Sequence, residues 1–94
     1  MRYERKLGDV LAKVYRTMEL DTLADEMEVK RVYQGVVGDL ISKLTMEVKY
    51  SDGVLRVRYA SAALRTEISY KKTDLINKIN ENLGRRVVTR IDLL

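Results

Sequence analysis

Hydrophobic residues recur at three- and four-residue intervals through the first half of the chain, the spacing of amphipathic helices. One such stripe predicts a short first helix and consists of Leu7, Val10, Leu11, Val14 and Met18. A second helix is predicted from an Asp21 cap to about Leu44. Its apolar stripe consists of Val29, Tyr33, Val36, Val37, Leu40, Ile41 and Leu44.

A β-hairpin is predicted next, because Asp52-Gly53 is a preferred centre for a two-residue type I′ turn. A two-residue loop fixes which residues face each other. One face then carries the apolar pairs Tyr50–Leu55, Val48–Val57 and Met46–Tyr59. The other face carries Ser51–Val54, Lys49–Arg56 and Glu47–Arg58.

A third helix is predicted from Ala60 or Ser61 to Leu83, with Gly84 as the residue that ends it. Lys72 falls inside its apolar arc. The helix therefore either kinks near Thr73 or lets Lys72 extend its ammonium group to water, and the second alternative is favoured. The arc consists of Leu64, Ile68, Leu75, Ile79 and Leu83.

A last strand is predicted from Arg86 to about Leu93 by a two-residue alternation. One face carries Val87, Thr89, Ile91 and Leu93, and the other carries Arg86, Val88, Arg90 and Asp92. The resulting order is ααββαβ, an α+β fold with three helices on one face of a three-stranded sheet. With no proline and no linker-like stretch, residues 1–94 are expected to form a single domain.

Gly35 and Gly38 have the G-x-x-G spacing of the loop with which KH domains clamp a nucleic-acid backbone. Within the predicted helix they lie opposite the apolar stripe, beside Arg31 and Ser42, while the two valines between them are buried. This arrangement argues against a phosphate clamp. Two explanations remain for glycines in a helix, close approach of the first helix or a smooth partner-docking face, and the first is favoured.

Charge is unevenly distributed along the chain. Residues 1–47 carry 8 Lys and Arg against 9 Asp and Glu, whereas residues 48–94 carry 10 against 5. The second half therefore has a net charge of +5, which favours a polyanionic partner.

The chain contains no cysteine and no histidine, which removes the usual zinc ligands and the usual general base at neutral pH. We therefore expect a protein that is not an enzyme and needs no cofactor or metal. Asp21, Asp25 and Glu28 share a helix face and offer a cation site, although a solvated first turn explains them more simply. The sequence MRYERKLGDV lacks the apolar core of a signal peptide, so a cytoplasmic protein without membrane association is expected.

The outer face of the predicted sheet is the candidate binding surface. It carries five positive and two negative side chains, Lys49, Arg56, Arg58, Arg86, Arg90, Glu47 and Asp92. Lys49 opposite Arg56 is a like-charge pair that stability alone does not favour. No aromatic residue is predicted on this face, so contacts to phosphates rather than base stacking are expected there.

Several short motifs along the chain together resemble the bacterial family that includes the DciA-type replicative-helicase loaders. These are Tyr33 with Val37-Gly38, Asp52-Gly53 with Leu55 and Val57, Ser61-Ala62-Ala63-Leu64-Arg65 with Glu67, and Ile79-Asn80 with Leu83-Gly84. The resemblance spans residues 29–93, with Tyr33 where the family usually has tryptophan. It implies a KH-like fold and recruitment or loading of the replicative DNA helicase, with contacts to DNA.

From the resemblance and the charge we expect a DNA-replication accessory protein that binds the helicase, DNA or both. The basic outer face would act together with Arg65, Lys71 and Lys72 on the third helix, although a structural pair between Arg65 and Glu67 is an equal alternative. The chain ends at Leu94, whereas full loaders often carry further basic segments, so a minimal member that docks without loading, or one with another partner, is an alternative. The alternatives are an RNA- or single-strand-binding module and a protein-only adaptor, with a homodimer possible.

Overall fold

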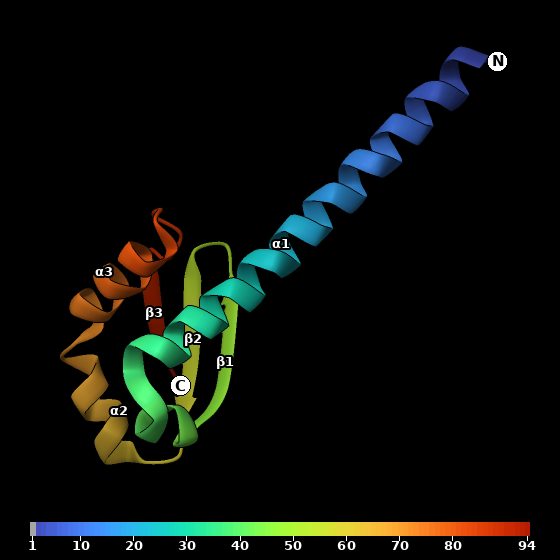
Figure 1. Cartoon of the computed structure of the whole chain (residues 1–94). Helices are drawn as coiled ribbons and strands as arrows, with labels where there is room; N and C mark the ends of the chain where they lie inside the picture. Colours follow the sequence, from blue (N-terminus) through green and yellow to red (C-terminus); the bar gives the residue numbers. More distant parts are fainter. Residues whose placement is uncertain (1) are drawn as a thin grey trace.

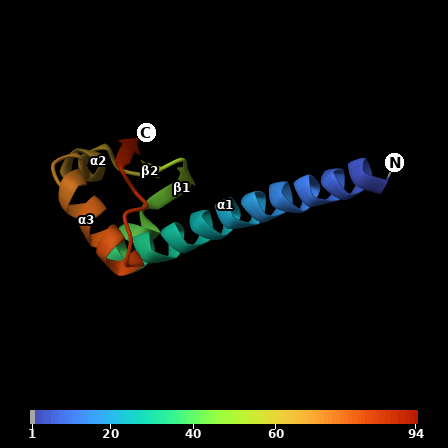
Figure 2. The ribbon, with the colours of Figure 1, turned by 90° about the horizontal axis from the view of Figure 1, so that it is seen from above.

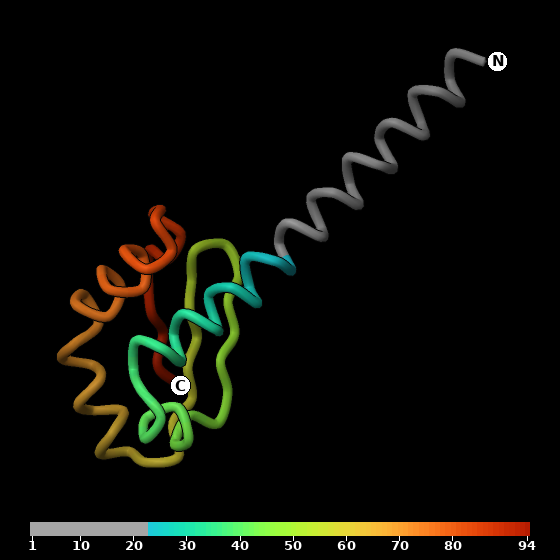
Figure 3. The backbone as a smooth tube through the Cα atoms, in the orientation of Figure 1, coloured from blue at the N-terminus to red at the C-terminus, as the bar shows by residue number. Residues whose placement is uncertain are grey.

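Residues 23–94 of this computed structural model are described in full, and residues 2–22 are described only as part of a helix (Figure 3). The expected apolar stripe from Leu7 to Met18 therefore lies outside the fully described residues, as does the side chain of Asp21. Within the described part, no helix is both long enough and apolar enough to cross a membrane.

The elements follow one another as α1 (Arg2–Lys43), β1 (Thr45–Ser51), β2 (Val54–Tyr59), α2 (Ala62–Ser69), α3 (Lys72–Leu83) and β3 (Arg90–Leu93) (Figure 1). The strands lie in the order β1-β2-β3, with β1 antiparallel and β3 parallel to the central β2. Helices α1, α2 and α3 cover the same face of this mixed sheet (Figures 1 and 2). The α+β class with helices on one face is confirmed, but the order of the elements differs from the expected ααββαβ.

The two helices expected before the hairpin are one helix, α1, and its irregularity lies at Gly38. Gly38 has φ 84° and ψ 172°, a conformation essentially restricted to glycine. The chain turns there, which moves Leu40 out of the apolar stripe while Ile41 still packs against the core. Leu40, expected in the core, is accordingly 74% exposed.

The helix expected after the hairpin is divided into α2 and α3, so the favoured alternative for Lys72 is wrong. Helix α2 begins as predicted, with the Ser61 hydroxyl accepting a hydrogen bond from the Leu64 amide. It ends in a tight turn in which the Tyr70 and Lys71 amides donate to carbonyls three residues back. Helix α3 starts at Lys72 and ends at Leu83, and the next residue, Gly84, has the left-handed conformation (φ 71°) expected of the glycine that ends a helix.

The hairpin forms with the expected turn, since Asp52 and Gly53 both have positive φ. The predicted pairing holds from Ser51–Val54 to Glu47–Arg58. It fails at the next pair, because a β-bulge aligns Thr45 instead of Met46 with Tyr59. The bulge leaves Met46 69% exposed and turns Thr45 toward α1.

The last strand is shorter than expected, because the side chain of Asn80 forms hydrogen bonds with the backbone just before the strand. The Asn80 Oδ1 atom accepts hydrogen bonds from the Val87 and Val88 amides, and its Nδ2 group donates to the Val88 carbonyl. These groups are then unavailable to a sheet ladder, so β3 starts only at Arg90. Val88, expected on the outer face, is fully buried instead.

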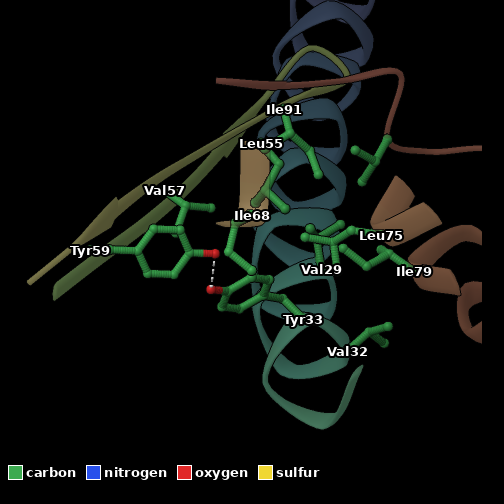
Figure 4. Close-up of a cluster of buried hydrophobic side chains, with 11 residues drawn as sticks. Val29, Val32, Tyr33, Leu55, Val57, Tyr59, Ile68, Leu75, Ile79 and Ile91 are labelled. Carbon is green, nitrogen blue, oxygen red and sulfur yellow. Dashed lines mark hydrogen bonds between the residues drawn. The ribbon is translucent and has the colours of Figure 1, made fainter. Parts of the chain in front are cut away.

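The core lies between α1, the α2–α3 pair and the inner face of the sheet (Figure 4). Its most buried large side chains are Tyr33, Leu55, Ile79, Ile91, Val29, Val57 and Val88. The Tyr33 and Tyr59 hydroxyls are hydrogen-bonded at 2.8 Å inside this core (Figure 4). Tyr33 also bonds Thr45 Oγ1 at 2.9 Å, which ties α1 to both strands of the hairpin.

Candidate nucleic-acid interface

The outer face of the sheet gathers six charged side chains, two from each strand. Alternate residues of a strand point to opposite faces. Because Leu55, Val57 and Ile91 face the helices and are buried, their neighbours face outward. We call this set the outer-face cluster, and its members are Glu47, Lys49, Arg56, Arg58, Arg90 and Asp92.

Each carboxylate of the outer-face cluster lies between two cations. Glu47 contacts Lys49 Nζ at 3.0 Å and Arg58 Nε at 3.5 Å. The hydrogen bond and charge of Lys49, followed by those of Arg58, hold the pKa of the Glu47 carboxyl below its usual value. Asp92 lies 3.0 Å from two nitrogens of Arg90, and its contact to Arg56 Nε is longer, at 4.0 Å.

The cluster thus consists of two triplets, each with one unneutralised positive charge. The four basic side chains remain between 48% and 67% exposed, so their hydrogen-bond donors are accessible to a ligand. The carboxylates also orient the guanidinium groups, which lowers the entropy lost when they bind a phosphate. This arrangement suits moderate, salt-sensitive binding of a polyanion.

Arg86 does not join this face, contrary to expectation. It lies in the segment between α3 and β3 and lines a shallow hollow of about 410 Å³. The other residues of that hollow all belong to α3: Ile76, Asn77, Asn80 and Glu81. The physical cause is the Asn80 side chain, which holds the following backbone out of the sheet.

The second basic group expected from the sequence, Arg65, Lys71 and Lys72, is distributed over two helices and the turn between them. Arg65 is exposed on α2, Lys71 is exposed in the turn, and Lys72 is half-buried at the start of α3. Within the described part of the chain, Arg65 and Glu67 form no ion pair with each other, so the structural pairing considered for them is absent. This group lies on the helical side, away from the outer-face cluster.

The expected docking face on α1 is interrupted. Arg31 and Gly35 are exposed before the kink, whereas Gly38, at the kink, and Ser42, after it, are half-buried. A methyl group added at Gly35 or Gly38 would meet no heavy atom within 4 Å among the described residues. Close approach of another helix is therefore not the reason for these glycines, and Gly38 is needed for its backbone conformation.

Two of the three acidic residues considered as a cation site, Asp25 and Glu28, bind an arginine instead, and the side chain of the third, Asp21, lies outside the fully described residues. The same Arg85 nitrogen contacts Asp25 Oδ1 at 2.7 Å and Glu28 Oε2 at 3.3 Å, which links α1 to the segment after α3. Within residues 23–94 no group of three or more acidic side chains is arranged to hold a metal ion. Arg85 was not singled out from the sequence, where its partners are about sixty positions away.

A comparison with protein families bears on what this surface is for. The family described as "Dna[CI] antecedent, DciA" matches residues 6–93 of the chain. The chain belongs to the DciA family. A comparison with curated proteins found no match.

Membership in the DciA family confirms the resemblance inferred from the sequence motifs and extends it toward the N-terminus. The DciA family is associated with loading of the replicative DNA helicase, so this chain belongs to a family of replication accessory proteins. The motif residues have structural roles here: Tyr33 is buried at the centre of the core, Asp52-Gly53 forms the hairpin turn, Ser61 caps α2, and Asn80 holds the segment before β3.

Proposed function

We propose that this protein is a non-enzymatic DNA-replication accessory protein that binds the replicative helicase and DNA. The match to the DciA family over residues 6–93 carries this proposal. Helices on one face of a three-stranded sheet support the KH-like relationship that the resemblance implies. In this proposal the protein performs no chemistry of its own and acts by holding two macromolecules together.

The outer-face cluster is the proposed contact to the DNA backbone. Lys49, Arg56, Arg58 and Arg90 present exposed donors on one surface, and their spacing follows the strands rather than a pocket. Such a surface contacts phosphates without reading base sequence. DNA binding should therefore be salt-dependent and show little sequence preference.

A loading assay tests the proposed function. The replicative helicase of the same organism is incubated with single-stranded circular DNA, with and without this protein, and the helicase retained on the circles is measured. We expect this protein to increase the retained helicase. Equal retention with and without it would contradict a loading role, and the chain would then be a docking protein or a member with another partner.

The alternative of an RNA-binding module makes a different prediction. Phosphate contacts alone do not distinguish RNA from DNA, because discrimination requires contacts to the 2′-hydroxyl. A strong preference for RNA over DNA of equal length would therefore favour the alternative. Absence of binding to either, near 50 mM salt where electrostatic binding is strong, would favour a protein-only adaptor.

A further inference from the structure

Tyr70 is an exposed aromatic residue in the turn between α2 and α3. Its side chain is 85% exposed, the largest fraction among the large hydrophobic side chains of residues 23–94. Tyr33, Tyr50 and Tyr59 are at least half-buried, and each uses its hydroxyl in a hydrogen bond. The Tyr70 side chain makes no hydrogen bond within the described part of the chain. Folding therefore gains little from an aromatic ring at this position.

Two lysines directly follow this ring. Lys71 and Lys72 form no ion pair within residues 23–94. In contrast, Lys30, Lys49 and Lys78 each have a carboxylate about 3 Å away. The turn therefore offers a flat aromatic surface next to two positive charges that the described residues do not neutralise.

A small apolar hollow adjoins this turn. It has a volume of about 110 Å³ and lies between α1 and the α2–α3 pair. Its apolar lining comes from Val36, Val37, Ile68 and Leu75, and its charged rim from Lys71, Asp74 and Lys78. Lys71 belongs both to the turn and to the rim of this hollow, so an apolar surface lies beside one of the two lysines that follow Tyr70.

We propose that the Tyr70 turn, defined as residues 70–72, binds single-stranded nucleic acid. One base stacks on the ring of Tyr70, and Lys71 and Lys72 contact the adjacent phosphates. Single-strand-binding proteins combine these same two elements, aromatic platforms for bases and positive charge for the backbone. Duplex DNA cannot use the ring, because its bases are stacked on one another. This inference rests on the DNA-binding part of the proposed function. It adds that the bound DNA is single-stranded and that the protein contacts it through a second surface besides the outer-face cluster.

Fluorescence anisotropy with three labelled probes tests the inference. The probes are oligothymidine of about 20 nucleotides, an abasic oligomer of the same length, and a duplex of that length, chosen to exceed the footprint of one small domain. The variants are Tyr70→Ala, Tyr70→Phe and Lys71→Ala/Lys72→Ala. Leu23→Ala is the control, since it removes another exposed apolar side chain from a different part of the protein.

Tyr70→Ala is expected to weaken oligothymidine binding by about 5- to 150-fold, the range for loss of one stacked base. Its affinity for the abasic and duplex probes should be unchanged. Tyr70→Phe should bind oligothymidine like the wild type, because the ring is retained. The double lysine variant should bind oligothymidine and the abasic oligomer more weakly, and Leu23→Ala should match the wild type on every probe.

Equal oligothymidine affinity of Tyr70→Ala and the wild type would overturn the inference and leave DNA binding by the outer-face cluster intact. Equal losses on the oligothymidine and abasic probes would also overturn it, because the ring would then not be contacting a base. Loss of helicase binding by Tyr70→Ala, with DNA binding retained, would assign the ring to a protein partner instead. If the wild type binds none of the probes, the inference fails together with the DNA-binding part of the proposed function, while helicase binding is tested independently.

Discussion

At the scale of single residues, Gly35 and Gly53 show how differently two glycines are constrained. Gly35 lies within α1 with open space where a methyl group would be. Gly53 has φ 82°, and a Cβ atom there would lie 2.8 Å from Thr89 Oγ1. One glycine is therefore replaceable, and the other is required by both the turn and its neighbour.

These two positions give a matched pair of substitutions. Gly53→Ala should lower the free energy of unfolding by about 1–3 kcal/mol, the usual cost of a non-glycine residue in a strained backbone conformation. Gly35→Ala should raise it by about 0.5–1 kcal/mol, because alanine favours the helix. Urea unfolding measures both. A stabilised Gly53→Ala variant would contradict the hairpin geometry described here.

Tyr59 makes the free energy of unfolding depend on pH in the alkaline range. Burial, and then the hydrogen bond with Tyr33, raises the pKa of Tyr59 above its usual value near 10. Since the folded protein keeps the neutral phenol, the contribution of Tyr59 is fully present below pH 10 and is lost as the pH rises above it. The loss amounts to at most about 1.4 kcal/mol per pH unit.

The comparison of wild type with Tyr59→Phe isolates this effect. Between pH 8 and pH 11 the wild type should lose more unfolding free energy than Tyr59→Phe, which has no phenol to ionise at this position. Tyr70→Phe serves as the control, because it removes an exposed hydroxyl instead of a buried one. Parallel pH profiles for wild type and Tyr59→Phe would show that Tyr59 is not held neutral in the folded state.

At the scale of elements, the segment between α3 and β3 is held by hydrogen bonds from two side chains, mainly from Asn80. Asn80 makes three hydrogen bonds to the backbone of Val87 and Val88. Tyr50 adds a fourth hydrogen bond by donating to the Val87 carbonyl at 3.1 Å. These bonds take the place of a ladder along this segment, so its conformation and the start of β3 depend on them.

Asn80→Ala should therefore be strongly destabilising. At about 0.5–1.5 kcal/mol for each of three hydrogen bonds, the free energy of unfolding should fall by about 1.5–4.5 kcal/mol in urea titration. Amide exchange at Val87 and Val88 should accelerate as well. Asn82→Ala is the control, because the exposed Asn82 side chain donates to Lys78 of its own helix. Similar stabilities for the two variants would refute the role assigned to Asn80.

The hairpin and the composition of the outer face could largely be predicted from the sequence, because a two-residue turn and a two-residue alternation are local rules. The bulge at Met46 was not predictable from these rules, since it depends on contacts of Thr45 with α1. The kink at Gly38 and the displacement of Arg86 likewise depend on the fold around them. The position of Tyr70 next to Lys71 and Lys72 is visible in the sequence. Its exposure could not be predicted, because it results from the break between α2 and α3.

At the scale of the whole molecule, the two faces of the sheet differ in chemical character: one is covered by the helices and the other is charged and exposed. The helical face buries the core beneath it, while the outer face of the sheet carries the outer-face cluster with its four cations and two carboxylates. Charge on this second face does not stabilise a core. It is available for a partner, which is the basis of the DNA contact proposed above.

Charge reversal on that face should affect binding without unfolding the protein. Arg56→Glu/Arg58→Glu should weaken DNA binding and reduce the dependence of log affinity on log salt by about 1 for each phosphate that the variant no longer neutralises. Arg86→Glu makes a matched control, because Arg86 is equally basic but lies beside α3. An unchanged salt dependence in the folded double variant would remove the outer-face cluster from the DNA-binding surface.

The central claim is that this member of the DciA family binds the replicative helicase. Size-exclusion chromatography with light scattering, on this protein mixed with the helicase of the same organism at about 10 μM each, tests it most directly. We predict a shifted peak whose mass corresponds to a stoichiometric complex. Two separate peaks would mean a binding free energy weaker than about −7 kcal/mol, and that result would contradict a direct helicase partner for this chain.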